Sequence, residues 1–343
     1  MKTRTLTVLD LERDRENIAE AGKLLREGGT VIIPTETVYG LAANAYDPEA
    51  VARIFEAKGR PSDNPLIVHI DSLAMLPPLV SVLPQGAMEL ARRFWPGPLT
   101  IIMPKSDLIP MKTSGGLDTV AVRMPSCRAA RAIIEAAGVP LAAPSANLSG
   151  SPSPTTFAHC VHDMMGRVDA IVEGEPCAVG VESTVITLAT PIPRLLRPGA
   201  VTLAQLREVL GEVEMDRGVL ERLDESVKVS SPGMKYKHYA PRADVTLLRG
   251  SGEDFARYVN EHHEDSCYAV CFEEELPLIK APVLCCGGRE DYGAQAHALF
   301  DLLRSLDDMG AKKAYIHAPS PEGIGLAVYN RLIRCAGFQI IEL

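Results

Sequence analysis

The sequence predicts a two-domain α/β protein, in which a mixed, twisted sheet with helices precedes a smaller Rossmann-like α/β domain. A chain of 343 residues is too long for one ordinary domain. Its content of 46% hydrophobic and 23% charged residues is typical of a globular protein with a sizeable core. Short β-branched apolar runs alternate with segments of helical periodicity on both sides of a polar stretch. We therefore expect domains over 1–210 and 244–343, joined by a linker over 211–243.

The first domain contains one clear strand and one clear helix near its start. Segment 29–34 predicts a buried strand, because a run of β-branched residues precedes a proline that stops the hydrogen-bond ladder. Asp47 and Pro48 predict the start of a helix as its N-cap and first residue, and Gly59 predicts its end. Further strands are expected over 66–70, 99–103, 119–122, 141–143, 170–172 and 183–188, and helices over 127–137, with Ser126 as N-cap, and over 203–210.

The stretch 211–243 predicts an interdomain linker, because acidic residues and arginine alternate there with few large apolar residues. Ser230-Ser231-Pro232-Gly233 breaks the chain in its middle. The second half is unusually aromatic and basic for a spacer, with Tyr236, His238 and Tyr239 close together. These side chains either contact a ligand or pack on a domain surface, and the sequence leaves both alternatives open.

The last hundred residues predict the second α/β unit. Strands are expected over 245–248, 268–272, 283–286, 314–317 and 339–342, and helices near 253–262, 291–307 and 324–336. Such alternation indicates a Rossmann-like layered sheet. Gly323-Ile324-Gly325 precedes the last helix, but a lone GxG indicates a tight turn more often than an anion site.

Charge and composition narrow the class of function. The net charge of −9 argues against broad, sequence-independent binding of nucleic acid through its phosphates. No apolar run approaches the roughly 20 residues that span a bilayer, so we expect no membrane contact and a cytoplasmic location. The eight cysteines form no CxxC pair, and we expect reduced, mostly buried thiols rather than a zinc site.

Two short motifs, Lys58-Gly59-Arg60 and Ser145-Ala146-Asn147, each follow the end of a regular element. Arginine offers a planar fork of donors to phosphate oxygens, lysine offers a compact charge, and serine and asparagine add neutral hydrogen bonds. If the motifs converge, they suit a nucleoside triphosphate. No GxxxxGK[ST] run is present, so the phosphates would be held without a Walker loop.

Polar side chains also follow several predicted strands, where α/β proteins usually bind ligands. Thr35 and Tyr39 lie in the segment after the first strand, and His69 at a strand end is either a general base or an orienting group. Arg123 ends an apolar strand and needs a carboxylate partner from the protein or from a ligand. The loop 144–155 is rich in serine and glycine and could wrap phosphates. No Ser/His/Asp triad or metal cage is recognisable.

Seven longer motifs occur in order along the chain: PTETVYGLA, KGRPSDNPLIVHI, FWPGPLT, APSANLSGSPSPT, ESTVI, RPGA and SPGMKYKHYAP. Together they resemble the YrdC-type family of threonylcarbamoyl-AMP synthases in its long two-domain form, over nearly the whole chain. The resemblance implies a YrdC-like catalytic domain over 1–210 and a linker that folds over the active site. The role of the C-terminal domain stays open.

The resemblance implies a nucleotidyltransferase that condenses L-threonine, bicarbonate or CO2, and ATP to threonylcarbamoyl-AMP and pyrophosphate. The product would pass to the machinery that forms threonylcarbamoyladenosine in tRNA, and Mg2+ would be held through the ATP phosphates. The implied catalytic residues are Lys58, Arg60, Ser145 and Asn147. The implied ATP contacts are Arg60, Asn64, Thr119, Ser145, Ser153, Arg197, Tyr236 and His238, and the implied threonine contacts are Thr35, His69, Arg123, Ala143 and Ser183.

Two alternatives remain at this stage. The same fold could make a carbamoyl-adenylate for another acceptor, as YrdC-like domains do in hydrogenase maturation. A non-catalytic module could instead bind RNA weakly through a local basic site, although the net charge of −9 disfavours this.

Overall fold

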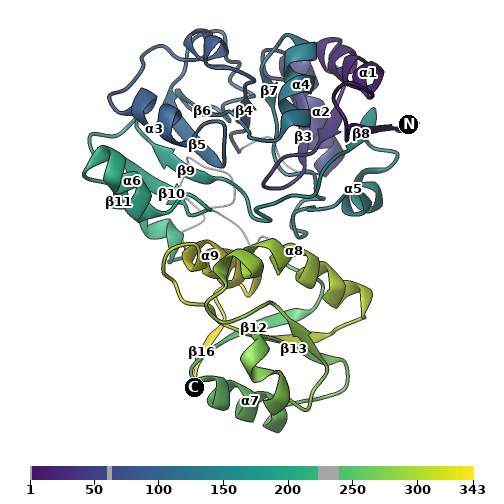
Figure 1. Cartoon of the computed structure of the whole chain (residues 1–343), viewed down its shortest axis with the longest axis vertical. Coiled ribbons are helices and arrows are strands. Elements are labelled where there is room, and N and C mark those ends of the chain that lie inside the picture. The colour runs from purple at the N-terminus through teal and green to yellow at the C-terminus, as the bar shows by residue number, and fades with distance from the viewer. Residues whose placement is uncertain (1, 60–63, 223–238) are drawn as a thin grey trace.

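The computed structural model describes residues 2–59, 64–222 and 239–343, which form two α/β bodies with one sheet each (Figure 1). An 11-stranded sheet forms the first body, and a 5-stranded sheet forms the second. The predicted fold class is therefore confirmed. Within the described parts of the chain, no helix is long and apolar enough to cross a membrane.

The first sheet is mixed, because β4 runs parallel to β6 but antiparallel to β7. Its strands, in spatial order, are β1 (Arg4–Thr7), β8 (Ala170–Glu173), β2 (Val31–Ile33), β3 (Gly40–Asn44), β7 (Leu141–Ala142), β4 (Ile67–His69), β6 (Thr119–Arg123), β5 (Leu99–Pro104), β9 (Thr184–Thr187), β10 (Arg194–Arg197) and β11 (Glu214–Met215). The helices of this body are α1 (Arg15–Arg26), α2 (Pro48–Lys58), α3 (Ala87–Phe94), α4 (Arg128–Ala137), α5 (Phe157–Met164) and α6 (Leu203–Leu210), with short 3-10 helices at Leu73–Met75, Pro77–Leu79 and Arg217–Val219.

Alternating side chains of the sheet bury two cores on its opposite faces. Ile32 of β2 packs into the core that contains α2, α3, α5 and α6. Its neighbours Val31 and Ile33 pack with α1 and α4 on the other face. On β4 and β6 that second face is continued by Ile67 and Ala121, which belong to a separate small cluster of buried residues. The residues two positions further along these strands, His69 and Arg123, point to the same face and begin the functional site.

The prediction of α2 from local sequence signals is confirmed. Asp47 is its N-cap and accepts hydrogen bonds from the backbone nitrogens of Glu49 at 2.9 Å and Ala50 at 3.2 Å. Gly59 ends the helix in the left-handed conformation with φ 63°. The expectation for the N-cap of α4 was wrong, because that helix starts one residue later, with Cys127 at the cap and no side-chain capping bond.

Four strands of the first sheet, β1, β3, β10 and β11, lie where no regular structure was expected. β3 begins at Gly40, inside the segment after the first strand, and pairs antiparallel with β2. β11 lies within the expected linker 211–243 and pairs parallel with β10. The first part of that linker therefore extends the first sheet, and residues 223–238 lie outside the described parts of the chain.

The second sheet is parallel throughout and has the expected Rossmann-like layering. Its spatial order is β14 (Val283–Cys285), β13 (Cys267–Cys271), β15 (Lys313–His317), β12 (Asp244–Arg249) and β16 (Ile340–Glu342). The helices are α7 (Gly252–Glu261), α8 (Tyr292–Asp308) and α9 (Gly325–Cys335), with a 3-10 helix at Glu273–Leu278.

Helices α8 and α9 lie between the second sheet and the first body, while α7 covers the far face (Figure 1). The hydrophobic core around α8 and α9 includes Val38 and Val181, which belong to the first body. The two bodies therefore share apolar core residues at their contact. This contact places α8 and α9 next to the segments that carry the predicted site residues.

Candidate ligand-binding site

A polar cavity lies on the face of the first sheet that continues from Ile67 to His69, opposite the core of α2 and α3. About 590 Å³ of non-atom space lies within its bounds, and this figure includes open solvent. Its lining residues are Thr35, Thr37, Val38, Tyr39, Gly40, Ile67, His69, Arg123, Ala143, Pro144, Ser145, Glu182, Ser183, Arg197 and Tyr239. All five residues assigned to threonine by the resemblance are among them.

Arg123 has the carboxylate partner that its place on an apolar strand requires. Its Nη2 lies 2.6 Å from Oε1 of Glu36, and both side chains are buried, with 4% and 9% exposure. Nη1 donates to the hydroxyl of Thr37 at 2.9 Å and Nε donates to the carbonyl of Gly97 at 3.3 Å. The contact between Nη2 and Oε1 is an ion pair without hydrogen-bond alignment, so both atoms retain hydrogen-bonding capacity.

The Glu36 carboxyl is ionised. Burial, the largest single influence, raises its pKa, but the charge of Arg123, its hydrogen bond and nearby backbone hydrogen bonds together lower it, and the net pKa lies below the ordinary value. Arg123 lines the cavity, whereas its partner Glu36 is not among the lining residues. An anionic group of a ligand, such as a carboxylate, can therefore approach the guanidinium.

His69 is neutral in this site. Burial and the neighbouring Arg123 lower its pKa to about 3. Its Nδ1 lies 3.2 Å from the carbonyl oxygen of Ile67, and since a carbonyl only accepts, Nδ1 is the donor. A histidine with so low a pKa is a weak base, so the geometry favours the orienting role over general base catalysis.

A chain of hydrogen bonds joins the loop 144–155 to the start of β9. The Ser153 hydroxyl donates to Oε1 of Glu182 at 2.5 Å. The next residue, Ser183, shares a hydrogen bond of 2.8 Å with Thr100. Arg197 donates from Nε to the carbonyl of Ser183 at 3.0 Å and from Nη2 to its hydroxyl at 3.2 Å. The implied ATP contacts Ser153 and Arg197 are thus linked through Glu182 and Ser183.

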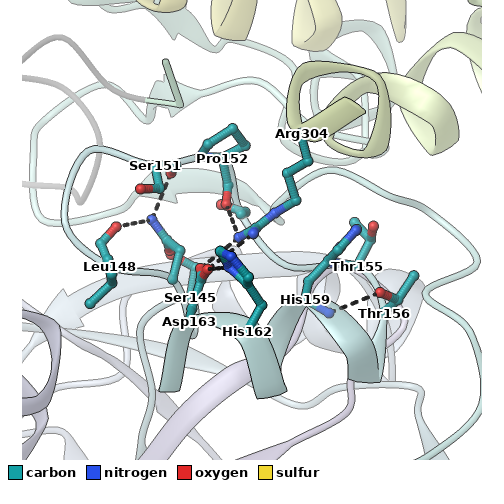
Figure 2. A network of polar contacts seen from close by, with 12 residues as sticks. Ser145, Leu148, Ser151, Pro152, Thr155, Thr156, His159, His162, Asp163 and Arg304 are labelled. Atoms are coloured by element: carbon teal, nitrogen blue, oxygen red, sulfur yellow. Dashed lines mark hydrogen bonds and ion pairs between the residues drawn. The ribbon is translucent and has the colours of Figure 1, made fainter. Parts of the chain in front are cut away.

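The two signature motifs converge, as far as the described residues reach. The buried Lys58 ammonium donates to the carbonyls of Ser145 and Asn147, the latter at 2.7 Å. The Ser145 hydroxyl donates to Oδ1 of Asn147 at 2.6 Å. The Asn147 amide nitrogen donates to the carbonyls of Leu148 and Ser151, which lie along the loop shown in Figure 2. The lysine therefore fixes the loop that the sequence expected to wrap phosphates.

The described residues of the predicted site divide into two groups. Thr35, His69, Arg123, Ala143, Ser145, Ser183 and Arg197 line the cavity, whereas Lys58, Asn64, Thr119, Asn147 and Ser153 do not. Lys58, Asn147 and Ser153 contact residues of the lining or their immediate neighbours through the bonds given above. Arg60, Tyr236 and His238 lie outside the described parts of the chain.

Tyr239 is a further lining residue, and the structure bears on one of the two alternatives that the sequence left open for it. Its side chain lines the cavity and is 4% exposed, and its ring lies 5.3 Å from that of Phe300 on α8. Its backbone has φ 65°, a left-handed conformation that non-glycine residues adopt only under constraint from their surroundings. Tyr239 therefore packs against the second body, as one alternative had it, and it also borders the cavity, while contact with a ligand stays a prediction.

Sequence reasoning missed the roles of Glu36 and Glu182. Each carboxylate pairs with an arginine that is distant in sequence, Arg123 and Arg331 respectively. Glu182 is adjacent to the predicted Ser183, and this is the single local signal that could have drawn attention to it. The pairings themselves depend on contacts that only the folded chain reveals.

The fold and the site together define an α/β protein with a cavity lined by two arginines, Arg123 and Arg197, and by several hydroxyl groups. The family model described as "Telomere recombination", for Sua5, YciO and YrdC proteins, matches residues 23–199. A second model, "Threonylcarbamoyl-AMP synthase, C-terminal domain", matches residues 201–337. The chain belongs to the Sua5/YciO/YrdC family and carries the C-terminal domain of its two-domain members.

Relatives match over almost the full length. A threonylcarbamoyl-AMP synthase of Bacillus subtilis is 45% identical over 97% of this chain and 96% of its own. A threonylcarbamoyl-AMP synthase of Pyrococcus abyssi is 43% identical over 96% of this chain and 98% of its own. Two solved structures of P. abyssi Sua5 are 40% identical to it.

These solved structures share the arrangement of both bodies. A doubly substituted variant of P. abyssi Sua5 superposes with a TM-score of 0.93, over 99% of this chain and 98% of the other. The complex of P. abyssi Sua5 with L-threonine superposes with a TM-score of 0.90 over the whole of both chains.

Proposed function

We propose that this chain is an ATP-dependent threonylcarbamoyl-AMP synthase, which makes threonylcarbamoyl-AMP and pyrophosphate from L-threonine, bicarbonate or CO2, and ATP. This reaction is the first step of threonylcarbamoyladenosine formation in tRNA. The observation that carries the proposal is that all five residues implied to bind threonine, Arg123 among them, line one cavity. The name of the relatives and the threonine complex of P. abyssi Sua5 support it.

In the proposed threonine complex, the guanidinium of Arg123 binds the substrate carboxylate, and the ion pair with Glu36 keeps the guanidinium in place. Ser183 and the turn of Thr35 border the side chain, and Ala143 contributes its shape. The Thr35 hydroxyl donates to the carbonyl of Val38 at 2.6 Å and so keeps this turn in place. The site is preorganised, which reduces the entropy lost on binding.

The first chemical step joins threonine and the one-carbon substrate. The amine loses a proton, and its nitrogen then attacks the carbon of CO2, or of bicarbonate with loss of water, to give N-carboxy-threonine. Because the pKa of His69 is lowered to about 3 by burial and by Arg123, a phosphate oxygen of ATP is a better proton acceptor than this ring.

The second step is nucleotidyl transfer, which makes the enzyme a nucleotidyltransferase. An oxygen of the new carboxylate attacks the α-phosphorus of ATP, and the bond from that phosphorus to the bridging oxygen of pyrophosphate breaks. Positioning and charge neutralisation supply most of the catalysis in such reactions. We assign neutralisation to Arg60 and Arg197, and assign to Lys58, Ser145 and Asn147 the shaping of the phosphate loop.

We propose that the remaining ATP contacts are Asn64, Thr119, Ser153, Tyr236 and His238, with Mg2+ entering as part of the MgATP substrate. Glu182 lines the cavity and pairs with Arg331, and Glu36 pairs with Arg123. The described residues contain no group of three or more side chains that could hold a metal ion. The donor set therefore fits a Mg2+ ion bound by phosphates and water.

Two further assignments go with this function. The labile product would pass to the machinery that transfers the threonylcarbamoyl group to tRNA, and weak RNA binding would assist that transfer. A cytoplasmic location would give the enzyme access to ATP and to that machinery.

The test is pyrophosphate release from ATP by the purified full-length chain, with L-threonine and bicarbonate omitted one at a time. We expect release only when both are present. Release without threonine would indicate another carbamoyl acceptor. No release from the folded protein in any mixture would overturn the proposal in favour of a binding module.

A further inference from the structure

Helix α9 of the second body presents three buried polar side chains to the first body. Asn330 donates from its amide to the carbonyl of Val219 at 2.6 Å. Arg334 donates to the carbonyl of Gly218. Arg331 lies between them in sequence and is 0% exposed, although it carries a full charge. A charge so deeply buried is costly unless it is paired and fully hydrogen-bonded.

The partners of Arg331 lie mainly in the first body. Nε lies 3.0 Å from Oε2 of Glu182, and Nη2 donates to the backbone carbonyl of Glu182 at 3.2 Å. Nη1 donates to the carbonyl of Pro198, and also to Ala327 of its own helix at 3.1 Å. One guanidinium therefore holds both the side chain and the backbone of Glu182, and the turn after β10 as well.

These acceptors adjoin the residues proposed for ATP. Glu182 accepts the hydroxyl of Ser153 at 2.5 Å through its other carboxylate oxygen. Pro198 directly follows Arg197, whose guanidinium is bonded to Ser183. Arg331 does not line the cavity, but two of the segments that do are fixed by it.

We propose that Arg331 is a positioning residue for the nucleotide, through which the C-terminal domain fixes Glu182, Ser153 and the Arg197 turn in their working places. The inference rests on the proposed function, and it gives the C-terminal domain a part in the ATP site that the sequence motifs left open. Arg331 acts through these residues and does not touch the reacting atoms.

The ionisation of Glu182 agrees with this role. Burial raises the pKa of its carboxyl, but Arg331, then Arg197 and the hydrogen bond from Ser153, lower it, and the net pKa lies below the ordinary value. An ionised Glu182 can only accept, which orients the Ser153 hydroxyl toward it. Loss of Arg331 removes the largest of these stabilising charges and leaves the carboxylate buried.

The threonine side of the cavity has separate supports. Arg123 is held by Glu36, Thr37 and Gly97, none of which contacts Arg331 among the bonds described above. Ser183 borders both sides, but its hydroxyl keeps its bond to Thr100. The role proposed for Arg331 therefore concerns ATP much more than threonine.

The experiment measures pyrophosphate release by the full-length Arg331→Met variant, with ATP and L-threonine varied separately. We expect kcat/KM for ATP to fall by roughly 100-fold, the effect typical of a misplaced binding group. KM for threonine should change less than about threefold. Asn330→Ala is the matched control, because it removes a buried hydrogen bond between the same helix and the first body without touching Glu182.

Two more variants separate positioning from stability. Arg331→Met with Glu182→Gln removes both charges and avoids the unpaired carboxylate, so its melting temperature should return toward that of the wild type. Its kcat/KM for ATP should stay low, because the bonds to the two backbone carbonyls are still missing. Arg331→Lys keeps the charge but loses the fork of donors, and we expect an intermediate value.

The outcomes distinguish failure of the proposed function from failure of the positioning role of Arg331. If the wild type releases no pyrophosphate, the proposed function fails and the positioning role fails with it. If the wild type is active and folded Arg331→Met uses ATP as well as Asn330→Ala does, the positioning role alone is wrong. Equal losses for ATP and threonine would also overturn it, since they indicate a general structural effect.

Discussion

His69 and Arg123 are direct partners in the register of the parallel strands β4 and β6, and both are buried at the wall of the cavity. The guanidinium of Arg123 adds to the effect of burial and keeps His69 neutral, with a pKa of about 3. The sheet thus places the charged guanidinium of Arg123 beside the imidazole of His69, which stays neutral at neutral pH. This arrangement confines positive charge to Arg123, where the substrate carboxylate is proposed to bind.

The neutral state of His69 makes stability depend on pH. Its folded pKa lies below the ordinary value near 6.5, so the unfolded chain takes up a proton that the folded chain does not. The contribution to stability is complete above pH 6.5 and is lost as the pH falls toward 3, at about 1.4 kcal/mol per pH unit. Urea unfolding at about pH 7 and about pH 5 should show a smaller loss for His69→Gln than for the wild type. Equal losses would contradict the assignment of a neutral His69.

Arg123→Met should impair threonine binding selectively. It removes the proposed partner of the substrate carboxylate, and truncating one member of a buried charge pair costs at least about 2 kcal/mol. We therefore expect KM for threonine to rise by about 30-fold or more. Adding Glu36→Gln in a second variant keeps the protein folded without an unpaired carboxylate. Calorimetry measures the affinity for threonine and for a non-hydrolysable ATP analogue. Unchanged affinity for threonine in the double variant would refute the role of Arg123 in threonine binding.

Lys58→Ala should abolish turnover in a protein that remains folded. The ammonium donates to two carbonyls of the segment 145–147, and without it the phosphate loop loses its anchor. Lys112→Ala is the matched control, since Lys112 forms an ion pair with the exposed Glu49 at 3.6 Å. Arg60→Ala should also stop turnover, and this expectation rests on the sequence motif alone. Pyrophosphate release together with circular-dichroism melts measures both effects, and undiminished turnover in either variant would remove that residue from the proposed site.

Arg304 should hold the phosphate loop against the second body. It forms a bidentate pair with the buried Asp163 of α5, at 3.1 Å and 2.7 Å, and donates to the carbonyl of Pro152 at 2.6 Å (Figure 2). Arg304→Met should destabilise the protein by about 3–5 kcal/mol, because the buried Asp163 loses its arginine and keeps only the contact with His162 at 3.0 Å. Hydrogen exchange over residues 148–156 should accelerate.

The neighbouring pair of His159 and Asp301 provides the control for Arg304. It joins the same two helices at 3.3 Å, but the Asp301 side chain is 60% exposed. Asp301→Asn should change the free energy of unfolding by less than about 1 kcal/mol. A similar loss from both variants would show that burial of Asp163 does not set the strength of this contact.

Removal of free Mg2+ by EDTA should stop turnover without lowering the melting temperature. The metal is proposed to enter with the ATP phosphates, so the folded protein without nucleotide has no use for it. A fall in melting temperature of several degrees on EDTA treatment, measured without nucleotide, would instead indicate a metal bound by the protein itself.

Local signals allowed α2 and the strands of the second sheet to be predicted from sequence. Asp47, Pro48 and Gly59 act through bonds within a few residues, so their pattern is visible in the chain itself. β3 was missed because its residues Gly40, Ala42 and Ala43 are small and lack the β-branched character that marks strands. Its pairing with β2 comes from tertiary structure.

The cavity residues of the threonine side were found through the family motifs, and the structure brings all of them to one cavity. The pairs Glu36–Arg123 and Glu182–Arg331 could not be predicted, because their members are separated by 87 and 149 positions in the chain. Nothing in the local sequence specifies such partners. The first pair joins the segment between β2 and β3 to the end of β6, and the second follows from the contact of α9 with the first body.

Val38 and Val181 belong to the hydrophobic core around α8 and α9, although both come from the first body. A fragment that ends before residue 239 would expose these two valines to water, and Glu182 would lose Arg331 at the same time. Expression of the YrdC-like part alone should therefore yield a protein that aggregates or requires the missing half in trans. For this chain the smallest unit suited to purification and to screening of inhibitors is the complete polypeptide.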